Sequence, residues 1–247
     1  MDHFSSFDGV RIAFHDSGAG RPALMLHGFL ANGQNNFVNP GIAGAAQAAG
    51  FRTIIPDLRG HGESDMPEEP AAYPVDVLAM DQEALLQHLG NKDYVLIGYS
   101  LGARTAVRML ARGAKPARAV IAGMGDSGIT DAKGRSADFE DLIRNGASSA
   151  NPALAQTVAG MMKRWNLKRQ AMLNILEQQA STSPAALKQI MVPALVVSGR
   201  DDDDNGSAEG LAQLLGNATA QRTPGNHLSA VQTPELARAI VDFIAAG

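Results

Sequence analysis

The sequence predicts an α/β protein with a mostly parallel twisted sheet, helices on both faces of the sheet and one helical insertion. Short apolar runs alternate with segments of helical spacing along most of the 247 residues, as they do in parallel α/β folds. The middle runs are apolar at consecutive positions, which is typical of strands buried on both faces. A long stretch without any strand-like run, residues 127–190, interrupts this alternation and predicts the insertion.

The predicted strands are seven short runs, at residues 11–16, 23–28, 51–57, 94–100, 118–125, 194–200 and 219–225. Apolar residues at helical spacing predict one helix over Val75, Leu78, Leu85, Leu86 and Leu89, and a second over Val107, Met109 and Leu110. A last helix closes the chain, with Thr233 as its N-cap and Pro234 at its first position.

Residues 127–190 carry helical apolar spacing, clearest at Leu154, Val158, Met161, Met162 and Trp165. We interpret this segment as a helical cap over the strand ends. It would divide a core domain made of residues 1–126 and 191–247. Ordinary crossover helices, which would absorb about half of this length, are the alternative.

The composition excludes several classes of protein. The net charge is −4 and no long block of Lys or Arg occurs, so we expect no nucleic-acid partner. No apolar run reaches the roughly 18 residues of a membrane span, so we expect no membrane partner. The chain has no cysteine, which excludes disulfides and thiolate chemistry. The N-terminus lacks the pattern of a signal peptide, and we therefore expect a cytoplasmic protein.

The segment "GYSLG", residues 98–102, places Ser100 between two glycines where a strand gives way to a helix. It matches G-x-S-x-G, the nucleophile elbow, in which a tight turn presents the serine hydroxyl above the sheet. The flanking glycines are needed because larger side chains would force the strand and the helix apart. Ser100 is therefore the candidate nucleophile, and a buried turn serine is the alternative.

A serine hydroxyl needs a base to take its proton, and the chain has six histidines. His227 lies on the loop between the last predicted strand and the last helix, where open α/β sheets place their sites. We expect His227 to be the base, with His61 as a weaker candidate. The base in turn needs an acid, and four aspartates, residues 201–204, directly follow a strand. At least two of them fit an ordinary solvated turn.

These pieces together resemble the α/β-hydrolase superfamily, in its serine-nucleophile branch with a small helical cap. The resemblance rests on "LMLHGF", "IPDLRGHGESD", "GYSLGA", "VSGRDDD" and "GNHLSAVQTPELARAIVDFI". It implies the chain order Ser, Asp, His. It also implies an acid at the third residue after Gly199, which is Asp202. Asp201, Asp203 and Asp126 remain alternatives.

The resemblance also implies an oxyanion hole formed by the backbone N–H groups of Phe29 and Leu101. His27 would then brace the turn beside it. A serine nucleophile fits hydrolysis of an ester, thioester, lactone or amide through an acyl-enzyme, and it argues against haloalkane dehalogenases and epoxide hydrolases, whose nucleophile is an aspartate.

Three alternatives stay open. Carbon–carbon hydrolases of ring-cleavage products keep the serine, but they carry tryptophan where this chain has Leu228. A non-catalytic protein that binds a small molecule is the second, and a perhydrolase or haloperoxidase side activity is the third.

The substrate pocket is predicted from apolar residues of the insertion, Met161, Met162, Trp165 and Met172, and from Leu228 beside the base. Packing of cap against core is the alternative role for them. The expected partner is a small to medium, fairly apolar ester. No metal-ligand spacing and no dinucleotide motif occurs, so no cofactor is expected. The sequence does not indicate the oligomeric state.

Overall fold

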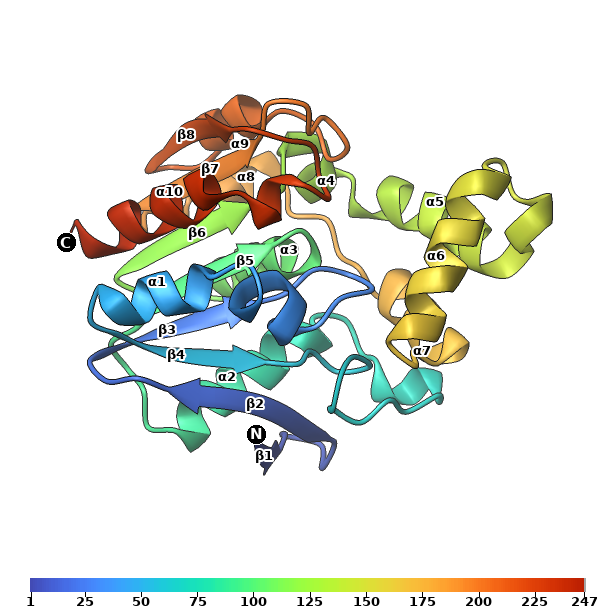
Figure 1. Ribbon diagram of the computed structural model, residues 1–247, viewed down its shortest axis with the longest axis horizontal. Coiled ribbons are helices and arrows are strands. Elements are labelled where there is room, and N and C mark those ends of the chain that lie inside the picture. Colours follow the sequence, from blue (N-terminus) through green and yellow to red (C-terminus); the bar gives the residue numbers. More distant parts are fainter. Residues whose placement is uncertain (247) are drawn as a thin grey trace.

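The computed structural model describes residues 1–246, and one eight-stranded sheet forms its centre (Figure 1). The strands are β1 (Asp2–Ser5), β2 (Arg11–Ser17), β3 (Arg21–Leu26), β4 (Phe51–Pro56), β5 (Val95–Tyr99), β6 (Arg118–Ala122), β7 (Ala194–Gly199) and β8 (Ala218–Thr223). Their order across the sheet is β1-β2-β4-β3-β5-β6-β7-β8. Strand β2 is antiparallel to β1 and β4, and the pairs from β4 to β8 are parallel. The predicted fold class is confirmed.

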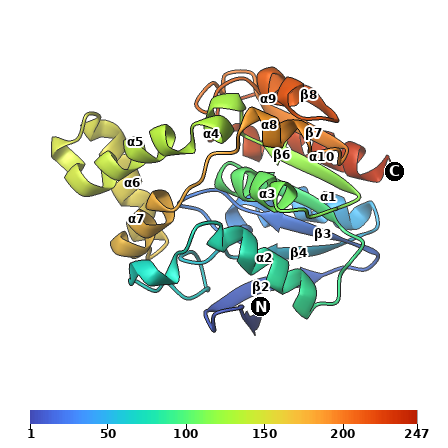
Figure 2. The ribbon, with the colours of Figure 1, turned by 180° about the vertical axis from the view of Figure 1, so that it is seen from behind.

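Helices lie on both faces of this sheet. The α-helices are α1 (Ile42–Ala48), α2 (Val77–His88), α3 (Leu101–Ala111), α4 (Asp126–Thr130), α5 (Ala132–Asn145), α6 (Pro152–Arg164), α7 (Arg169–Glu177), α8 (Pro184–Lys188), α9 (Ala208–Leu214) and α10 (Pro234–Ala245). Shorter turns are η1 (Gln34–Val38), η2 (Pro70–Ala72), η3 (Gly146–Ser148) and η4 (Ala230–Gln232). Helices α1 and α10 cover one face, and α2, α3 and α9 cover the other (Figures 1 and 2).

The consecutive apolar positions of the central strands fill two cores. In β5, Val95 and Ile97 pack with α1 and α10, whereas Leu96 between them packs with α2 and α3. Alternate side chains of a strand point to opposite faces, so a strand covered on both sides must be apolar throughout. The same rule places Val196 and Val197 of β7 in different cores.

The structure differs from the sequence prediction at β1 and at the start of α2, and it adds helices α1 and α9, which were not predicted. Strand β1 was not predicted, because only Phe4 of its four residues is buried and no alternation can be recognised. It pairs with β2 at the edge of the sheet. The predicted helix over Val75 begins at Val77 instead, and Val75 is exposed. The closing helix has the predicted cap, since the Thr233 hydroxyl accepts a hydrogen bond from the N–H of Leu236.

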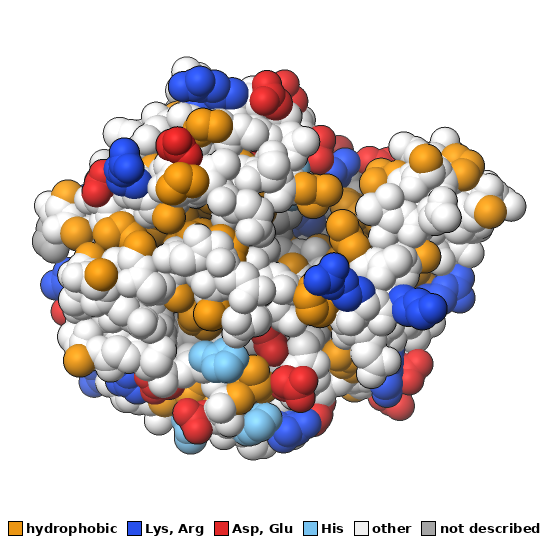
Figure 3. All heavy atoms as spheres, viewed as in Figure 1, with side chains coloured by type: hydrophobic (Ala, Val, Ile, Leu, Met, Phe, Trp, Pro, Cys, Tyr) orange, Lys and Arg blue, Asp and Glu red, His pale blue; other side chains and the backbone are white. Residues whose placement is uncertain are grey.

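Residues 127–190 contain no strand in the structure. Helices α6 and α7 both pack on α5, and the three helices stand beyond the carboxyl ends of the parallel strands (Figure 1). Between these three helices and the body of the molecule the surface is hollowed (Figure 3). Helices α4 and α8 lie closer to the sheet and contact α9.

None of the helices within the described residues combines the length and the apolar character that crossing a bilayer requires.

Candidate active site

Ser100 occupies the sharp turn between β5 and α3, with φ 53° and ψ −112°. A non-glycine residue in this conformation is strained, and such strain gathers at functional sites. The neighbouring glycines make the turn possible. A Cβ at Gly98 would overlap the backbone of Gly102, and a Cβ at Gly102 would overlap the carbonyl oxygen of Leu26 on β3. The spacing G-x-S-x-G therefore reflects a close approach of helix, strand and neighbouring strand.

The structure brings Ser100, His227 and Asp202 into one line of hydrogen bonds. Nε2 of His227 lies 3.0 Å from Oγ of Ser100. Nδ1 of the same ring lies 3.1 Å from both carboxylate oxygens of Asp202. A carboxylate accepts, so Nδ1 carries the proton and donates a hydrogen bond to Asp202, while Nε2 is left to accept a hydrogen bond from the serine hydroxyl. This is the arrangement in which a neutral imidazole can act as general base.

The sequence left four aspartates as candidates for the acid, and Asp202 is the one that contacts His227. Its side chain is buried, whereas Asp201 and Asp203 on the same loop are exposed. The fourth, Asp126, accepts hydrogen bonds from the N–H groups of Ser127 and Ser207 and thereby ties α4 to the start of α9.

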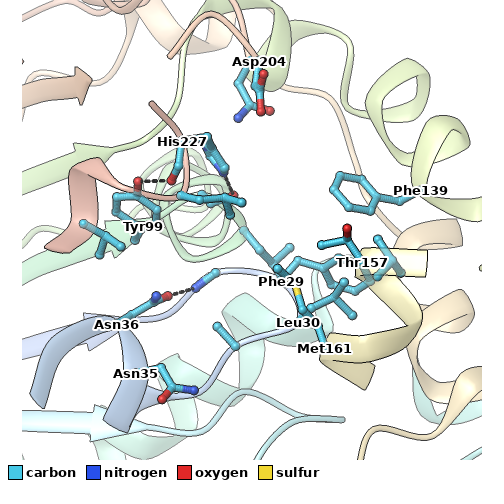
Figure 4. Close-up of a pocket in the computed structure, with 18 of the residues that line it drawn as sticks. Phe29, Leu30, Asn35, Asn36, Tyr99, Phe139, Thr157, Met161, Asp204 and His227 are labelled. Carbon is cyan, nitrogen blue, oxygen red and sulfur yellow. Dashed lines mark hydrogen bonds between the residues drawn. The ribbon is translucent and has the colours of Figure 1, made fainter. Parts of the chain in front are cut away.

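Tyr99 holds the loop that carries His227. Its hydroxyl donates a 2.6 Å hydrogen bond to the backbone carbonyl of His227, and the two rings lie 5.7 Å apart (Figure 4). Burial and the nearby Asp202 raise the pKa of Tyr99, so this donor stays protonated. Tyr99 was not among the residues predicted from the sequence. Its place inside the elbow motif, directly before Ser100, is the signal that could have indicated it.

His27 and His61 form a buried pair away from the serine. The Leu58 N–H donates to Nε2 of His27, and Nδ1 of His27 therefore donates to the Gly28 carbonyl at 2.8 Å. Burial lowers the pKa of His27 to about 4 and that of His61 to about 3. Both rings are enclosed and neither lines the cavity beside Ser100. The structure therefore does not place His61 as a base for Ser100, and His27 braces the turn as expected.

The backbone at Phe29 and Leu101 leaves two N–H groups free beside the serine. Leu101 begins α3, where the first N–H groups have no partner within the helix. Neither N–H is taken by another group in residues 1–246. The turn before Phe29 comes so close that a Cβ on Gly28 would lie 3.3 Å from Cβ of Ser100. Asn36 fixes this turn, since its Oδ1 accepts the Gly28 N–H at 2.7 Å. Asn36 was also missed, because nothing in "ANGQNNF" marks it.

A cavity of about 470 Å³ opens beside Ser100 and His227. Phe29 and Leu30 of the core, Phe139 of α5, and Thr157 and Met161 of α6 line this cavity (Figure 4), and the rings of Phe29 and Phe139 meet edge to face at 5.5 Å. Of the predicted lining residues, Met161, Trp165 and Leu228 lie on the cavity wall. Met162 and Met172 do not. One residue on from Met161 turns the side chain about 100° around the helix, and Met162 packs against the hydrophobic core instead.

Charged side chains also reach this cavity: Arg104 from α3, Arg135 from α5, Arg164 from α6 and Asp204 from the loop after β7. Within the described chain, one group could offer three ligand atoms to a metal ion, namely Asp202, Asp204 and His227. His227 and Asp202 already form a hydrogen bond with each other. A cation there would compete with the hydrogen bond that orients His227.

Comparisons with known proteins agree with this architecture. A family model described as "alpha/beta hydrolase fold" matches residues 22–223. The non-heme haloperoxidase of Rhodococcus erythropolis is 27% identical over 258 residues, covering 91% of this chain and 92% of the relative.

Two solved structures share the fold over nearly the whole chain. An esterase from Exiguobacterium antarcticum superposes with a TM-score of 0.76 at 19% identity, covering 99% of both chains. A variant of CumD, a meta-cleavage product hydrolase from Pseudomonas fluorescens, superposes with a TM-score of 0.77 at 20% identity, covering 100% of this chain and 98% of CumD.

Proposed function

This chain belongs to the alpha/beta hydrolase fold family, and we propose that it is a serine hydrolase that cleaves small to medium, fairly apolar carboxylic esters. Lactones and thioesters present the same acyl carbon and belong to the same proposal. The observation that carries it is the 3.0 Å contact between Nε2 of His227 and Oγ of Ser100 at the wall of the cavity.

In the first half of the reaction, His227 takes the proton of the Ser100 hydroxyl while Oγ attacks the ester carbonyl carbon. The carbonyl oxygen becomes an oxyanion that accepts hydrogen bonds from the N–H groups of Phe29 and Leu101. When the tetrahedral intermediate collapses, the C–O bond to the alcohol breaks. The alcohol leaves with the proton that His227 held, and the acyl group stays on Ser100.

In the second half, water replaces the alcohol. His227 takes a proton from the water as it attacks the acyl carbon, and then returns that proton to Oγ as the acid is released. Asp202 acts through His227: it keeps the proton on Nδ1 and stabilises the imidazolium that forms twice in each cycle.

The preferred acyl chain is inferred from the residues that line the cavity. Phe29, Met161, Trp165 and Leu228 supply apolar surface near Ser100, and burial of each methylene of an acyl chain against such surface is worth about 0.8 kcal/mol. Activity should therefore rise as the acyl chain lengthens, until the cavity of about 470 Å³ is filled.

The test is hydrolysis of p-nitrophenyl esters from acetate to octanoate by the purified protein, with the Ser100→Ala variant as control. We expect turnover by the wild type and none above the buffer rate by the variant. Wild-type rates equal to the buffer rate across the whole series would remove the esterase assignment. A carbon–carbon hydrolase or a protein that only binds a small molecule would then be favoured.

A further inference from the structure

Arg104 lies one helical turn after Ser100 on α3, and its N–H donates to the Ser100 carbonyl at 3.0 Å. Its side chain lines the cavity beside Ser100 and is 7% exposed. An arginine so deeply buried is ordinarily paired with a carboxylate, because removing an unpaired charge from water is costly.

Arg104 has no such partner. Its Nε donates to the Gly128 carbonyl at 3.0 Å, and its Nη1 lies 3.4 Å from Oε1 of Gln179. Its Nη2 has no hydrogen bond anywhere in residues 1–246, yet it is not among the fully enclosed polar atoms without a partner, so it keeps accessible surface. None of the ion pairs of the described chain includes this guanidinium.

Arg59, another deeply buried arginine, does have carboxylate partners. The Arg59 side chain is fully enclosed, and Asp8 and Asp81 both accept hydrogen bonds from it at 2.7–2.9 Å. The fold thus neutralises Arg59 with two carboxylates and leaves Arg104 with two neutral oxygens. No carboxylate of the described chain forms an ion pair with Arg104, although its side chain lines the cavity.

Two other cations line the same cavity. Arg135 forms ion pairs with Asp204, which is also on the cavity wall, at 3.5 Å and with Asp138 at 3.9 Å. Burial and the charge of Arg135 lower the pKa of Arg104 to about 10, so it remains charged at neutral pH. Arg164 is a third cation on the wall, with its guanidinium 5.0 Å from the Trp165 ring.

We propose that Arg104 binds a carboxylate of the substrate, so that the preferred substrate is an ester that also carries a free carboxylate, such as a monoester of a dicarboxylic acid. This inference rests on the proposed function and restricts the class of ester that the protein prefers. A carboxylate accepts from a guanidinium through charge-assisted hydrogen bonds, which are the stronger kind. The apolar wall would hold the methylene chain between the ester and the carboxylate.

The experiment compares monomethyl esters of succinate, glutarate, adipate and suberate with methyl esters of monocarboxylic acids of equal chain length, followed in a pH-stat at low ionic strength. A second arm uses neutral acyl esters whose alcohol carries the carboxylate, and thereby shows on which side of the ester the anion sits. We expect the wild type to prefer the anionic member of each matched pair in at least one arm.

The key readout is the ratio of kcat/KM for the anionic and the neutral ester. Arg104→Gln should lower this ratio about 10- to 100-fold, mainly through KM, because a charge-assisted contact is lost. Arg104→Lys should restore part of it. Arg238→Gln, which removes an exposed charge on α10 outside the cavity, should leave the ratio and the rate unchanged.

A structural role for Arg104 predicts a different result. Its bonds to Gly128 and Gln179 tie α3 to both ends of the helical insertion, and losing only that tie would lower both kcat/KM values alike and leave their ratio intact. An unchanged ratio overturns the proposal. So does a wild type with no preference for the anionic ester in either arm, a result that does not depend on whether Arg104→Gln folds.

Calorimetry separates this proposal from the esterase assignment. Free adipate or glutarate should bind wild-type protein more tightly than the matching diamide, and Arg104→Gln should remove the difference. If no ester is hydrolysed but this difference is found, the esterase assignment fails and the carboxylate site stands. If esters are hydrolysed and the dicarboxylates bind no better than the diamides, the carboxylate site fails alone.

Discussion

Nε2 of His227 lies 3.0 Å from Oγ of Ser100, although 127 positions separate the two residues along the chain. The contact depends on β5 and on the loop after β8, which the parallel sheet delivers to the same edge. Two further contacts hold the imidazole in place: both oxygens of Asp202 at Nδ1, and the Tyr99 hydroxyl at the backbone carbonyl. Each of these relationships leads to a measurable consequence.

Asp202→Asn should lower kcat by about four orders of magnitude, because an amide no longer keeps the proton on Nδ1 of His227. Asp203→Asn is the matched control on the same loop. Its carboxylate is exposed and lies 4.0 Å from Arg222, so this variant should keep kcat within a few-fold. Rates on p-nitrophenyl butyrate measure both. An equal loss in the two variants would show that the loop, and not the Asp202 contact, matters.

Gly102→Ala should prevent the elbow from forming, because the added Cβ would overlap the Leu26 carbonyl of β3. We expect loss of soluble folded protein or a fall in stability of several kcal/mol. Gly160→Ala is the matched control in α6, where nothing lies within 4 Å of the added Cβ, and it should stabilise the protein by about 0.5–1 kcal/mol. Urea denaturation tests both. Equal stability of the two variants would contradict the packing described at the elbow.

Met161→Ala should raise KM for the octanoate ester by roughly three- to tenfold, with little change for acetate, because only the longer chain reaches this part of the wall. Met162→Ala removes the same side chain one position on, where it packs against the core and not the cavity. That variant should lower the melting temperature while KM for octanoate stays near the wild-type value. If KM for octanoate rises in Met162→Ala and not in Met161→Ala, the acyl chain binds on the other side of α6.

The buried pair His27 and His61 should make stability fall in mild acid. Their pKa values in the folded protein are about 4 and about 3, below the ordinary 6.5. Above pH 6.5 both are neutral whether folded or unfolded, so their contribution is complete. As the pH falls below 6.5 the unfolded chain takes up protons that the folded protein excludes. Each histidine can thereby remove on the order of 3 kcal/mol by pH 4.

Urea denaturation between pH 7 and pH 5 measures this effect before most carboxylates titrate. His61→Phe keeps a ring against His27 and Phe29, which His61 contacts edge to face, and it should flatten the pH dependence. His3→Gln, on the exposed side of β1, should not. A wild-type free energy of unfolding that is flat from pH 7 to pH 5 would contradict the assignment of both rings as buried and neutral.

The fold could be predicted where the chain repeats a simple physical pattern. The central strands are buried on both faces, so residues such as Val95 to Ile97 are apolar without interruption and indicate a parallel sheet. Strand β1 could not be predicted in this way, because it lies at the edge and buries only Phe4.

The residues of the candidate site also differ in how clearly the sequence indicates them. Ser100 and His227 stand in local motifs, and a turn that requires glycines leaves a mark in the sequence. Tyr99, Asn36 and Arg104 act through contacts with residues 128, 8 and 24 positions away. No sequence spacing indicates these contacts, although the place of Tyr99 directly before Ser100 in the elbow motif could have marked it as a site residue. The wrong assignment of Met162 has the same origin, since helical spacing shows that a face is apolar but not which neighbour covers it.

Whether Ser100 is an activated nucleophile can be measured by treatment with a fluorophosphonate, followed by intact mass and peptide mapping. An activated serine displaces fluoride and keeps the phosphonyl group, whereas an ordinary hydroxyl does not react at a comparable rate. We predict one adduct per chain, located on Ser100, absent in Ser100→Ala and formed much more slowly in a folded His227→Gln variant. Labelling that persists in Ser100→Ala, or no labelling of the wild type, would show that Ser100 is not the activated nucleophile.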